Sequence, residues 1–253
     1  MASKHKRREI SMVDPRVSII DRRIESIRDI IAVSSGKGGV GKSLTASTLA
    51  LILAKRGYKV GLFDLDFTSP STHVILGVED VKPKEEKGII PPRVHGVEYM
   101  SIVYYSGERA APLRGADVSN ALIELLAITR WSELDFLIID MPPGIGDATL
   151  DVIRLIKRIK FLIITTPSQL AFETVKKLVN LLKDLKVQVL GVIENMKMDN
   201  SNLIRQKVQC LDVPYLGDIH FDAKIEGSIG NMNKLLLSDF ARKIDGIASK
   251  IVA

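Results

Sequence analysis

The sequence has few of the features that mark secreted or membrane-spanning chains. One cysteine, Cys210, occurs among the 253 residues, so no disulfide can form within the chain. No apolar stretch reaches the roughly 18 residues that predict a membrane-spanning helix. Residues 1–10 are basic but contain no hydrophobic segment of the kind found in signal peptides. We therefore expect a cytoplasmic protein without a membrane partner.

Internal repeats and low-complexity segments are also missing, and no feature of the sequence requires a second domain. With 253 residues, of which 46% are hydrophobic, the chain can bury one large core. We assign residues 1–28 to a basic N-terminal extension and residues 29–253 to a single domain. A basic cluster in the extension and a net charge of +6 allow weak, non-specific attraction to nucleic acid, although a solvated terminus explains the same residues. The cluster consists of Lys4, Lys6, Arg7 and Arg8.

Apolar runs of strand length alternate with helical patterns along most of the chain. Strands are expected at about residues 30–34, 59–63, 97–103, 134–140, 160–165 and 187–193. Helices are expected at about residues 43–55, 118–130, 148–158, 171–184 and 235–250. Continuously apolar strands that alternate with helices predict an α/β fold, in which a mainly parallel sheet carries helices on both faces in three layers.

Residues 34–43 read Ser-Ser-Gly-Lys-Gly-Gly-Val-Gly-Lys-Ser and match the phosphate-binding pattern G-x-x-x-x-G-K-[ST], between an expected strand and an expected helix. Glycines let backbone amides approach a triphosphate, and the start of the helix adds further donors. Lys42 is expected to reach the β- and γ-phosphates, and Ser43 to ligate Mg²⁺. The pattern predicts a P-loop NTPase fold. The predicted nucleotide contacts within it are Gly36, Lys37, Gly38, Gly39, Val40, Gly41, Lys42, Ser43 and Leu44.

A second lysine, Lys37, lies at the crest of this loop. Because Lys42 already serves the phosphates, we expect Lys37 to point outward. Such a lysine can reach the γ-phosphate held by a second subunit and supply positive charge during phosphoryl transfer, as an arginine finger does in trans. That role predicts a dimer, whereas a solvated loop lysine is the alternative.

Carboxylates end two of the expected strands. Asp64 and Asp66 follow the second strand, at the edge where open α/β sheets bind ligands. Two acids at i and i+2 point the same way, and a site with Mg²⁺ or an attacking water offsets their repulsion, although a turn or helix cap is the alternative. Asp140 ends the fourth strand. We expect Asp64 and Asp140 to hold Mg²⁺ through water, and Gly144 in the next loop to offer an amide to the γ-phosphate.

Residues 37–43 resemble the deviant Walker A motif of the MinD/ParA/ArsA class of P-loop ATPases, and further segments resemble its Mrp/ApbC branch. These segments occur in the family's order, between about residues 30 and 220. They are Leu113-Arg114-Gly115, Asp140-Met141-Pro142-Pro143-Gly144-Ile145-Gly146-Asp147, Thr165-Thr166-Pro167-Ser168, Gly191-Val192-Ile193-Glu194-Asn195-Met196 and Val213-Pro214-Tyr215-Leu216-Gly217-Asp218-Ile219.

The resemblance implies an ATP-dependent homodimer whose subunits meet at the nucleotides. It implies that Lys37 acts across the interface, that Asp66 positions the attacking water, and that Asn195 contacts adenine. The expected catalytic residues are therefore Lys37, Lys42 and Asp66. Residues 195–199, Asn-Met-Lys-Met-Asp, miss the guanine signature N-K-x-D by one position, which favours ATP.

The family is best known for carrying an iron–sulfur cluster on a C-x-x-C pair, with two subunits supplying four thiolates. Here Ser201 and Ile204 fall at about the positions of that pair, and neither is a thiolate ligand. Two copies of Cys210 give two sulfurs, short of the four that most clusters require, so we expect Cys210 to be a buried apolar residue. We expect an ATPase that binds no cluster by itself, or a heteromer in which a cysteine-bearing homologue supplies the missing thiolates.

The main alternative is a positioning or partition ATPase like MinD or ParA, which holds membrane or DNA while ATP is bound. Apolar residues of the last expected helix lie at helical spacing, as in a membrane-seeking tail, but we expect that helix to pack on the sheet. A small-molecule kinase is a third candidate, because it needs only the phosphate-binding loop.

Overall fold

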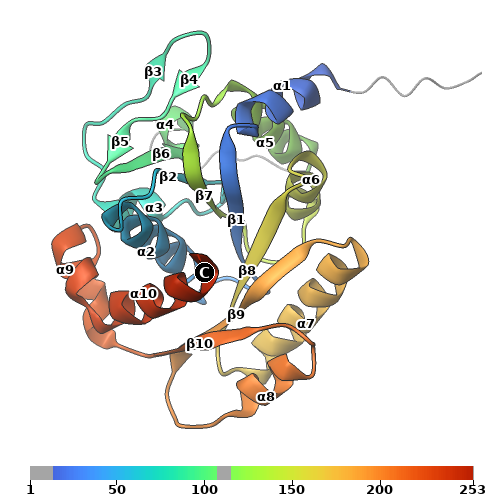
Figure 1. The fold of residues 1–253 in the computed structure, drawn as a ribbon, viewed down its shortest axis with the longest axis vertical. Helices are drawn as coiled ribbons and strands as arrows, with labels where there is room; N and C mark the ends of the chain where they lie inside the picture. The colour runs from blue at the N-terminus through green and yellow to red at the C-terminus, as the bar shows by residue number, and fades with distance from the viewer. Residues whose placement is uncertain (1–13, 107–114, 253) are drawn as a thin grey trace, which may run out of the picture.

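The computed structural model describes residues 14–106 and 115–252. The basic cluster near the N-terminus, and Leu113 and Arg114, lie outside the described residues. The main sheet consists of β1 (Ile27–Ser35), β2 (Val60–Asp64), β5 (Arg93–Val94), β6 (Val97–Ser101), β7 (Leu134–Asp140), β8 (Ile159–Thr165), β9 (Gln188–Lys197) and β10 (Tyr215–His220). Their order across the sheet is β10-β9-β8-β1-β7-β2-β6-β5, and β5 runs antiparallel to β6 while the other neighbours pair in parallel (Figure 1). Strands β3 (Lys84–Glu85) and β4 (Ile89–Ile90) form a separate hairpin.

Helices cover both faces of the sheet. One face carries α1 (Pro15–Ile24), α5 (Ala116–Ile128), α6 (Asp147–Leu155), α7 (Gln169–Asp184) and α8 (Leu203–Gln209). The other carries α2 (Lys42–Lys55), α3 (Thr72–Leu76), α9 (Met232–Leu237) and α10 (Asp239–Val252). The short helices α4 (Val103–Ser106) and η1 (Ala223–Ser228) lie in connections. The expected three-layer α/β fold with a mainly parallel sheet is confirmed (Figure 1).

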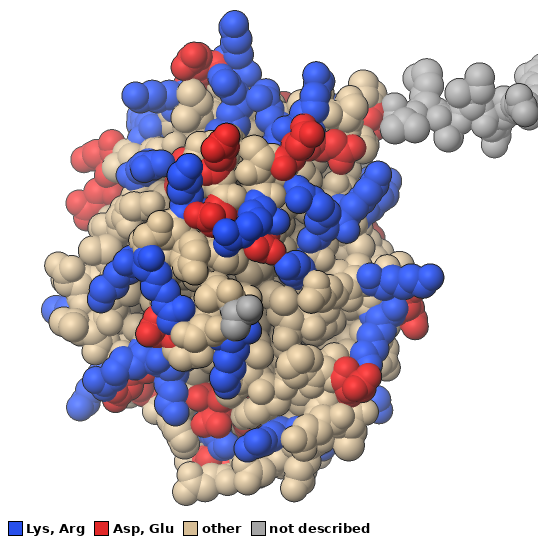
Figure 2. Space-filling view, viewed as in Figure 1, with Lys and Arg blue, Asp and Glu red and all other residues tan. Residues whose placement is uncertain are grey.

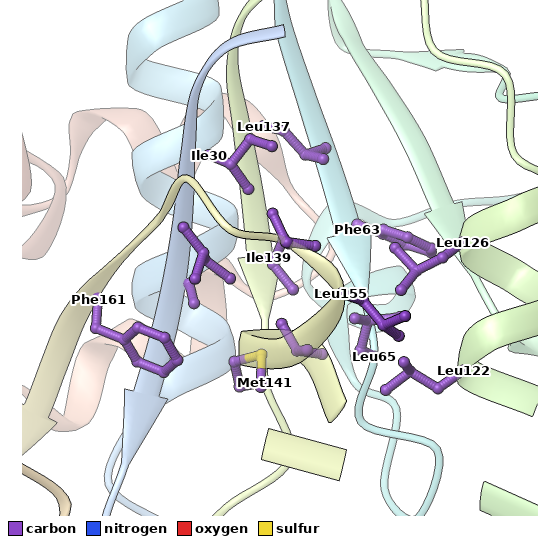
Figure 3. Packing of buried hydrophobic residues seen from close by; sticks show 14 of the residues in the cluster. Ile30, Phe63, Leu65, Leu122, Leu126, Leu137, Ile139, Met141, Leu155 and Phe161 are labelled. Carbon is purple, nitrogen blue, oxygen red and sulfur yellow. The ribbon is translucent and has the colours of Figure 1, made fainter. Parts of the chain in front are cut away.

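The core consists of two hydrophobic layers, one on each face of the sheet. Along β1, Ile30 and Ala32 face the layer under α5 to α7, whereas Ile31 and Val33 face the layer under α2. Figure 3 shows the first layer, where strand residues such as Ile139 meet α5 and α6. Burial of both faces explains why these strands are apolar without the alternation of a half-exposed strand.

The segment assigned to the N-terminal extension differs from expectation where the structure describes it. Residues 15–24 form α1, which begins at Pro15 after Asp14, whose side chain accepts a hydrogen bond from the Arg16 amide. Ile20 and Ile24 are buried, and α1 packs against α5. Although α1 is largely polar, these two isoleucines tie it to the core, so this part of the chain belongs to the folded domain.

Strand β10 was not predicted from the hydrophobic pattern of the sequence, whereas the packing of helix α10 was. The sequence analysis predicted no strand at 215–220, because Gly217 and Asp218 interrupt the apolar run there. The structure has β10 at this place, at the edge of the sheet with β9 as its neighbour. Helix α10 buries Phe240, Ile244 and Ile247 and packs against α2, as expected for a helix that covers the sheet.

The surface charge is mixed. On the face drawn in Figure 2, Lys and Arg side chains are spread widely and interspersed with Asp and Glu. Among the helices of residues 14–106 and 115–252, none has the length and apolar character needed to cross a membrane.

Candidate functional site

Strand order brings three loop regions together at one edge of the sheet. Strand β7 lies between β1 and β2, so the loop after β1 and the acids at the ends of β7 and β2 become neighbours. In the register of the sheet, Asp140 pairs with Val33 on one side and with Asp64 on the other. The carboxyl ends of parallel strands share an edge, and this edge therefore gathers the residues that the motifs identified.

The loop between β1 and α2 has the form of a phosphate cradle. Lys42, Ser43 and Leu44 form the first turn of α2, whose amides have no acceptor one turn earlier. Gly38 and Gly39 are exposed, whereas Val40 is buried. These amides and the positive end of the helix dipole suit an anion.

Glycine is required at two positions of this loop for different reasons. A Cβ on Gly36 would lie 2.1 Å from Thr174 Oγ1 of α7. Gly41 has φ +83°, and a Cβ there would lie 2.3 Å from Asn195 Nδ2. Asn195 Nδ2 donates a hydrogen bond to the Val40 carbonyl at 2.9 Å, so the end of β9 holds the loop from outside. The contacts of Thr174 and Asn195 with the loop were not foreseen, because both lie far away in sequence.

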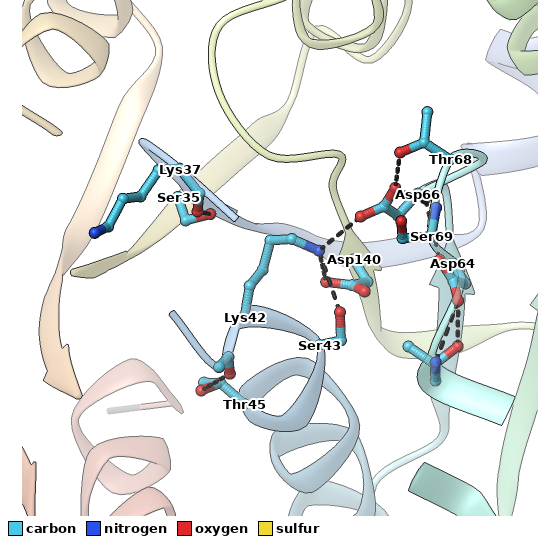
Figure 4. A network of polar contacts seen from close by, with 12 residues as sticks. Ser35, Lys37, Lys42, Ser43, Thr45, Asp64, Asp66, Thr68, Ser69 and Asp140 are labelled. Carbon is cyan, nitrogen blue, oxygen red and sulfur yellow. Dashed lines mark hydrogen bonds and ion pairs between the residues drawn. The ribbon is translucent and has the colours of Figure 1, made fainter. Parts of the chain in front are cut away.

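Lys42 is the centre of the charged cluster. Its side chain is 7% exposed, and Nζ donates to Asp140 Oδ1 at 2.6 Å and to Ser43 Oγ at 3.3 Å. Asp66 Oδ2 lies 3.7 Å from the same Nζ (Figure 4). A lysine buried to this degree requires anions around it, and here two carboxylates provide them.

Asp140 has one oxygen available to a cation. The residue is fully buried, and its Oδ2 has no hydrogen-bond partner among the described residues. Burial raises the pKa of Asp140, while the positive charge of Lys42 acts in the opposite direction. A buried, unpartnered carboxylate oxygen close to the Ser43 hydroxyl fits the oxygen ligands that Mg²⁺ prefers.

Asp64 has different surroundings, because both of its oxygens accept hydrogen bonds from its own loop. Oδ1 accepts from the Asp66 amide at 3.0 Å, and Oδ2 accepts from Thr72 Oγ1 at 2.5 Å. Burial, together with the nearby negative charge of Asp140, raises the pKa of Asp64 to about 7. The sequence predicted that Asp64 and Asp140 both hold Mg²⁺ through water, whereas in the structure both oxygens of Asp64 accept hydrogen bonds from the protein.

Asp66 is 5% exposed and is held within the loop that follows β2. Its Oδ1 accepts from Thr68 Oγ1 at 2.8 Å and from the Ser69 amide at 3.2 Å (Figure 4). The other oxygen, Oδ2, faces Lys42. Asp66 is thus placed beside the phosphate-binding lysine with one carboxylate oxygen directed toward it.

Lys37 and Gly144 lie on the outer side of the cradle. Lys37 is exposed, and Figure 4 shows its side chain extending away from Lys42, as expected from its place in the loop. The Lys37 carbonyl accepts from Ser35 Oγ at 2.9 Å. The Gly144 amide donates to the Ser35 carbonyl at 2.9 Å, so in this structure it is engaged with β1.

The residues considered for cluster binding do not form a metal site in the part of the chain that the structure describes. Cys210 is exposed at the end of α8, so the expectation that it is buried was wrong. The core-facing positions of this helix are taken by Ile204 and Val208, which are buried. Ser201 is exposed, whereas Ile204 is 1% exposed and packs in the core. Among the described residues, no group of three or more His, Cys, Asp or Glu side chains is arranged to hold a metal ion.

Comparison with known proteins agrees with this geometry. The family described as ParA: NUBPL iron-transfer P-loop NTPase matches residues 26–253. The iron-sulfur cluster carrier protein of Pseudomonas fragi is 42% identical over 177 residues, which are 68% of this chain and 62% of that protein. The carrier protein of the same name from Escherichia coli strain K12 is 42% identical over 178 residues, which are 69% of this chain and 48% of that protein. The chain thus spans about half to two thirds of the length of these curated relatives.

Solved structures show the same fold. A nucleotide-binding protein from Archaeoglobus fulgidus in complex with ADP is 31% identical, with a TM-score of 0.72, over 90% of this chain and 92% of that chain. The septum site-determining protein MinD from Pyrococcus horikoshii, complexed with Mg-ADP, is 25% identical, with a TM-score of 0.66, over 89% of this chain and 96% of that chain.

The buried acids make the stability of the nucleotide-free protein dependent on pH in a defined direction. The pKa of Asp64 rises from 3.8 to about 7 on folding, so the folded state keeps a proton that the unfolded state releases in this range. Raising the pH from about 4 to about 7 therefore destabilises the wild type through this group. Asp64→Asn cannot ionise, and we expect it to gain stability relative to the wild type over the same interval. Urea unfolding of both proteins at several pH values measures the difference, and a difference that stays constant with pH would contradict the assignment.

Proposed function

Because this chain belongs to the ParA/NUBPL family of iron-transfer P-loop NTPases, we propose that it is a Mg²⁺-dependent ATPase that acts as a nucleotide-driven switch in iron–sulfur cluster handling. The observation that carries the proposal is the buried Lys42, which lies at the phosphate cradle between Asp140 and Asp66. Relatives at about 40% identity are named iron-sulfur cluster carrier proteins, which supports the second half of the proposal.

In the proposed site, Lys42 exchanges partners when nucleotide binds. Its ammonium group is neutralised by Asp140 at 2.6 Å in the structure, and the β- and γ-phosphate oxygens of ATP would take over that role. Ser43 and Asp140 are the residues that would hold Mg²⁺, which, when bound, neutralises charge on the phosphate oxygens. Asn195 is proposed to lie beside adenine, with Oδ1 as the acceptor, since Nδ2 is bonded to Val40.

Hydrolysis requires an oriented water and positive charge near the γ-phosphate. We assign the first role to Asp66, whose Oδ2 faces Lys42. We assign the second to Lys42 from within the subunit and to Lys37 from a second subunit. Gly144 can donate to the γ-phosphate only by leaving the Ser35 carbonyl, so the loop after β7 would change position with the nucleotide state.

A homodimer is proposed because the nucleotide edge carries exposed apolar side chains around an outward-pointing lysine. Leu170, Met198 and Phe221 are 81%, 80% and 55% exposed. They follow β8, β9 and β10, and therefore lie at the same edge of the sheet as the phosphate cradle. A second copy that faces this edge would cover them and bring its Lys37 to the nucleotide.

The chain supplies the nucleotide machinery but few ligands for a cluster. Ile204 is 1% exposed and directed into the core, and Cys210 is an exposed single thiol in each subunit. We therefore propose that the cluster is held together with a cysteine-bearing homologue or client, and that this chain drives its loading or release. A cytoplasmic location fits both ATP as substrate and an exposed reduced thiol.

Replacing Lys42 tests the nucleotide site. Lys42→Ala is expected to weaken ATP binding by about tenfold or more, because a charge-assisted contact to phosphate is lost. Lys55→Ala, at the exposed end of the same helix, should bind as the wild type does. Calorimetric titration with a non-hydrolysable ATP analogue measures both affinities. Equal affinity of Lys42→Ala and wild type would rule out the assigned site.

Replacing Lys37 tests the action across a dimer interface. Lys37→Ala is expected to leave the affinity for nucleotide nearly unchanged and to lower kcat by about 10²- to 10³-fold, because transition-state charge loses one partner. Lys177→Ala, on the exposed face of α7, is the control. Phosphate release gives kcat, and sedimentation with and without ATP gives the subunit association. A variant that hydrolyses ATP at the wild-type rate would show that Lys37 is a solvated loop residue.

Cluster handling is tested with the purified chain and with the native complex. Anaerobic reconstitution of the chain alone is expected to leave no stable iron–sulfur absorbance, because two subunits offer two thiolates. Purification from its source with metal analysis should then recover iron together with a second, cysteine-bearing polypeptide. A stoichiometric cluster on the isolated chain would contradict the shared-ligand proposal while leaving the ATPase assignment intact.

A further inference from the structure

The loop that carries Asp66 is closed by a buried set of hydrogen bonds that the motifs did not reveal. Residues 65–71 connect β2 to α3, and Thr72 is the first residue of α3. Asp64 at one end of the loop accepts a hydrogen bond from the Thr72 hydroxyl at the other end, at 2.5 Å, and the Thr72 amide lies 3.4 Å from the same oxygen. One carboxylate thus joins the last residue of a strand to the first residue of a helix.

Tyr99 of β6 completes this set from the neighbouring strand. Its hydroxyl lies 2.8 Å from Thr72 Oγ1. Thr72 has a single hydroxyl proton, so when it donates that proton to Asp64 it accepts from Tyr99 in the second contact. Asp64 and Thr72 are 0% exposed and Tyr99 is 1% exposed, which means that water does not replace any of these bonds.

Asp66 depends on this closure for its position. Its Oδ1 accepts from Thr68 and Ser69, which belong to the same loop, and its backbone amide donates to Asp64 Oδ1. Among the described residues, the Asp66 side chain reaches beyond the loop through its contact between Oδ2 and Lys42 Nζ, at 3.7 Å. The distance from Asp66 to the phosphate cradle is therefore set by how the loop is anchored.

We propose that Thr72, supported by Tyr99, is a positioning residue for Asp66. In the hydrogen-bonded set of Asp64, Thr72 and Tyr99, which we call the latch, Asp64 serves as the anchor and not as an ion ligand. The proposal rests on the ATPase function proposed above and adds to it the residues that place the catalytic carboxylate. The two oxygens of Asp64 already accept hydrogen bonds, one from the Asp66 amide and one from the Thr72 hydroxyl. Of the neighbouring acids Asp64 and Asp140, it is Asp140 that has an oxygen without a hydrogen-bond partner among the described residues, and this oxygen can face a cation. Asp64 and Asp140 are therefore proposed to have different roles, because they have different hydrogen-bond partners.

Thr72→Val removes the hydroxyl and preserves the shape of the side chain. We expect kcat for ATP hydrolysis to fall about tenfold while the dissociation constant for ATP changes by less than about twofold, because Asp66 loses its placement and the cradle keeps its own. Thr72→Ser should restore kcat, and Tyr99→Phe should lower it in the same direction but less. Thr129→Val is the matched control, since it removes a buried hydroxyl that donates to the Leu125 carbonyl at the opposite edge of the sheet.

Hydrogen exchange supplies a readout that does not require turnover. In nucleotide-free protein, a peptide covering residues 65–72 should exchange faster in Thr72→Val than in wild type or Thr72→Ser. Faster exchange without any hydrolysis by the wild type would support the latch and reject the proposed ATPase function. Unchanged exchange, a wild-type kcat in Thr72→Val, or a parallel loss of ATP affinity would overturn the latch. If Thr72→Val does not fold, the same comparisons between Tyr99→Phe and wild type decide the question.

Discussion

The buried ion pair between Lys42 and Asp140 is the interaction on which the rest of the site depends. A lysine that is 7% exposed carries its charge in a medium where charge is poorly solvated, and its stability there requires a partner at 2.6 Å. The pair leaves Asp140 Oδ2 without a hydrogen-bond partner among residues 14–106 and 115–252. A magnesium-bound triphosphate meets both needs, because it supplies anionic oxygens for the lysine and a cation for the carboxylate. The site is thus built for a ligand that carries both charges.

The parallel sheet creates this pair from residues about a hundred positions apart. Strand β7 is inserted between β1 and β2, so its terminal aspartate lies between the phosphate-binding loop and the second acid-bearing strand. Helices on both faces exclude water from the strands up to their ends. The low polarity of these surroundings strengthens the charged contacts and raises the pKa values of Asp64 and Asp140.

The residues proposed for nucleotide binding and those considered for cluster binding lie in separate parts of this chain. The roles proposed for the cradle, for Lys37 and Lys42 and for Asp66 need only one subunit and its copy. The segment after β9, in contrast, has a core isoleucine at position 204 and one exposed cysteine beyond it. The family to which the chain belongs is described by iron transfer, and this description is the basis for proposing that a partner contributes the soft ligands.

The fold class and the phosphate-binding loop could be predicted from consecutive residues alone, because an apolar strand, a glycine-rich loop and a helix start are local features. The sequence also indicated that the Lys37 side chain points out of the loop, since Lys42 of the same motif occupies the inner position. The different hydrogen-bond partners of Asp64 and Asp140, the exposure of Cys210 and the packing of residues 15–24 on the core became visible in the folded chain alone. Each of these depends on which distant side chains surround a residue, as Thr72 and Tyr99 surround Asp64, and spacing along the chain does not contain that information.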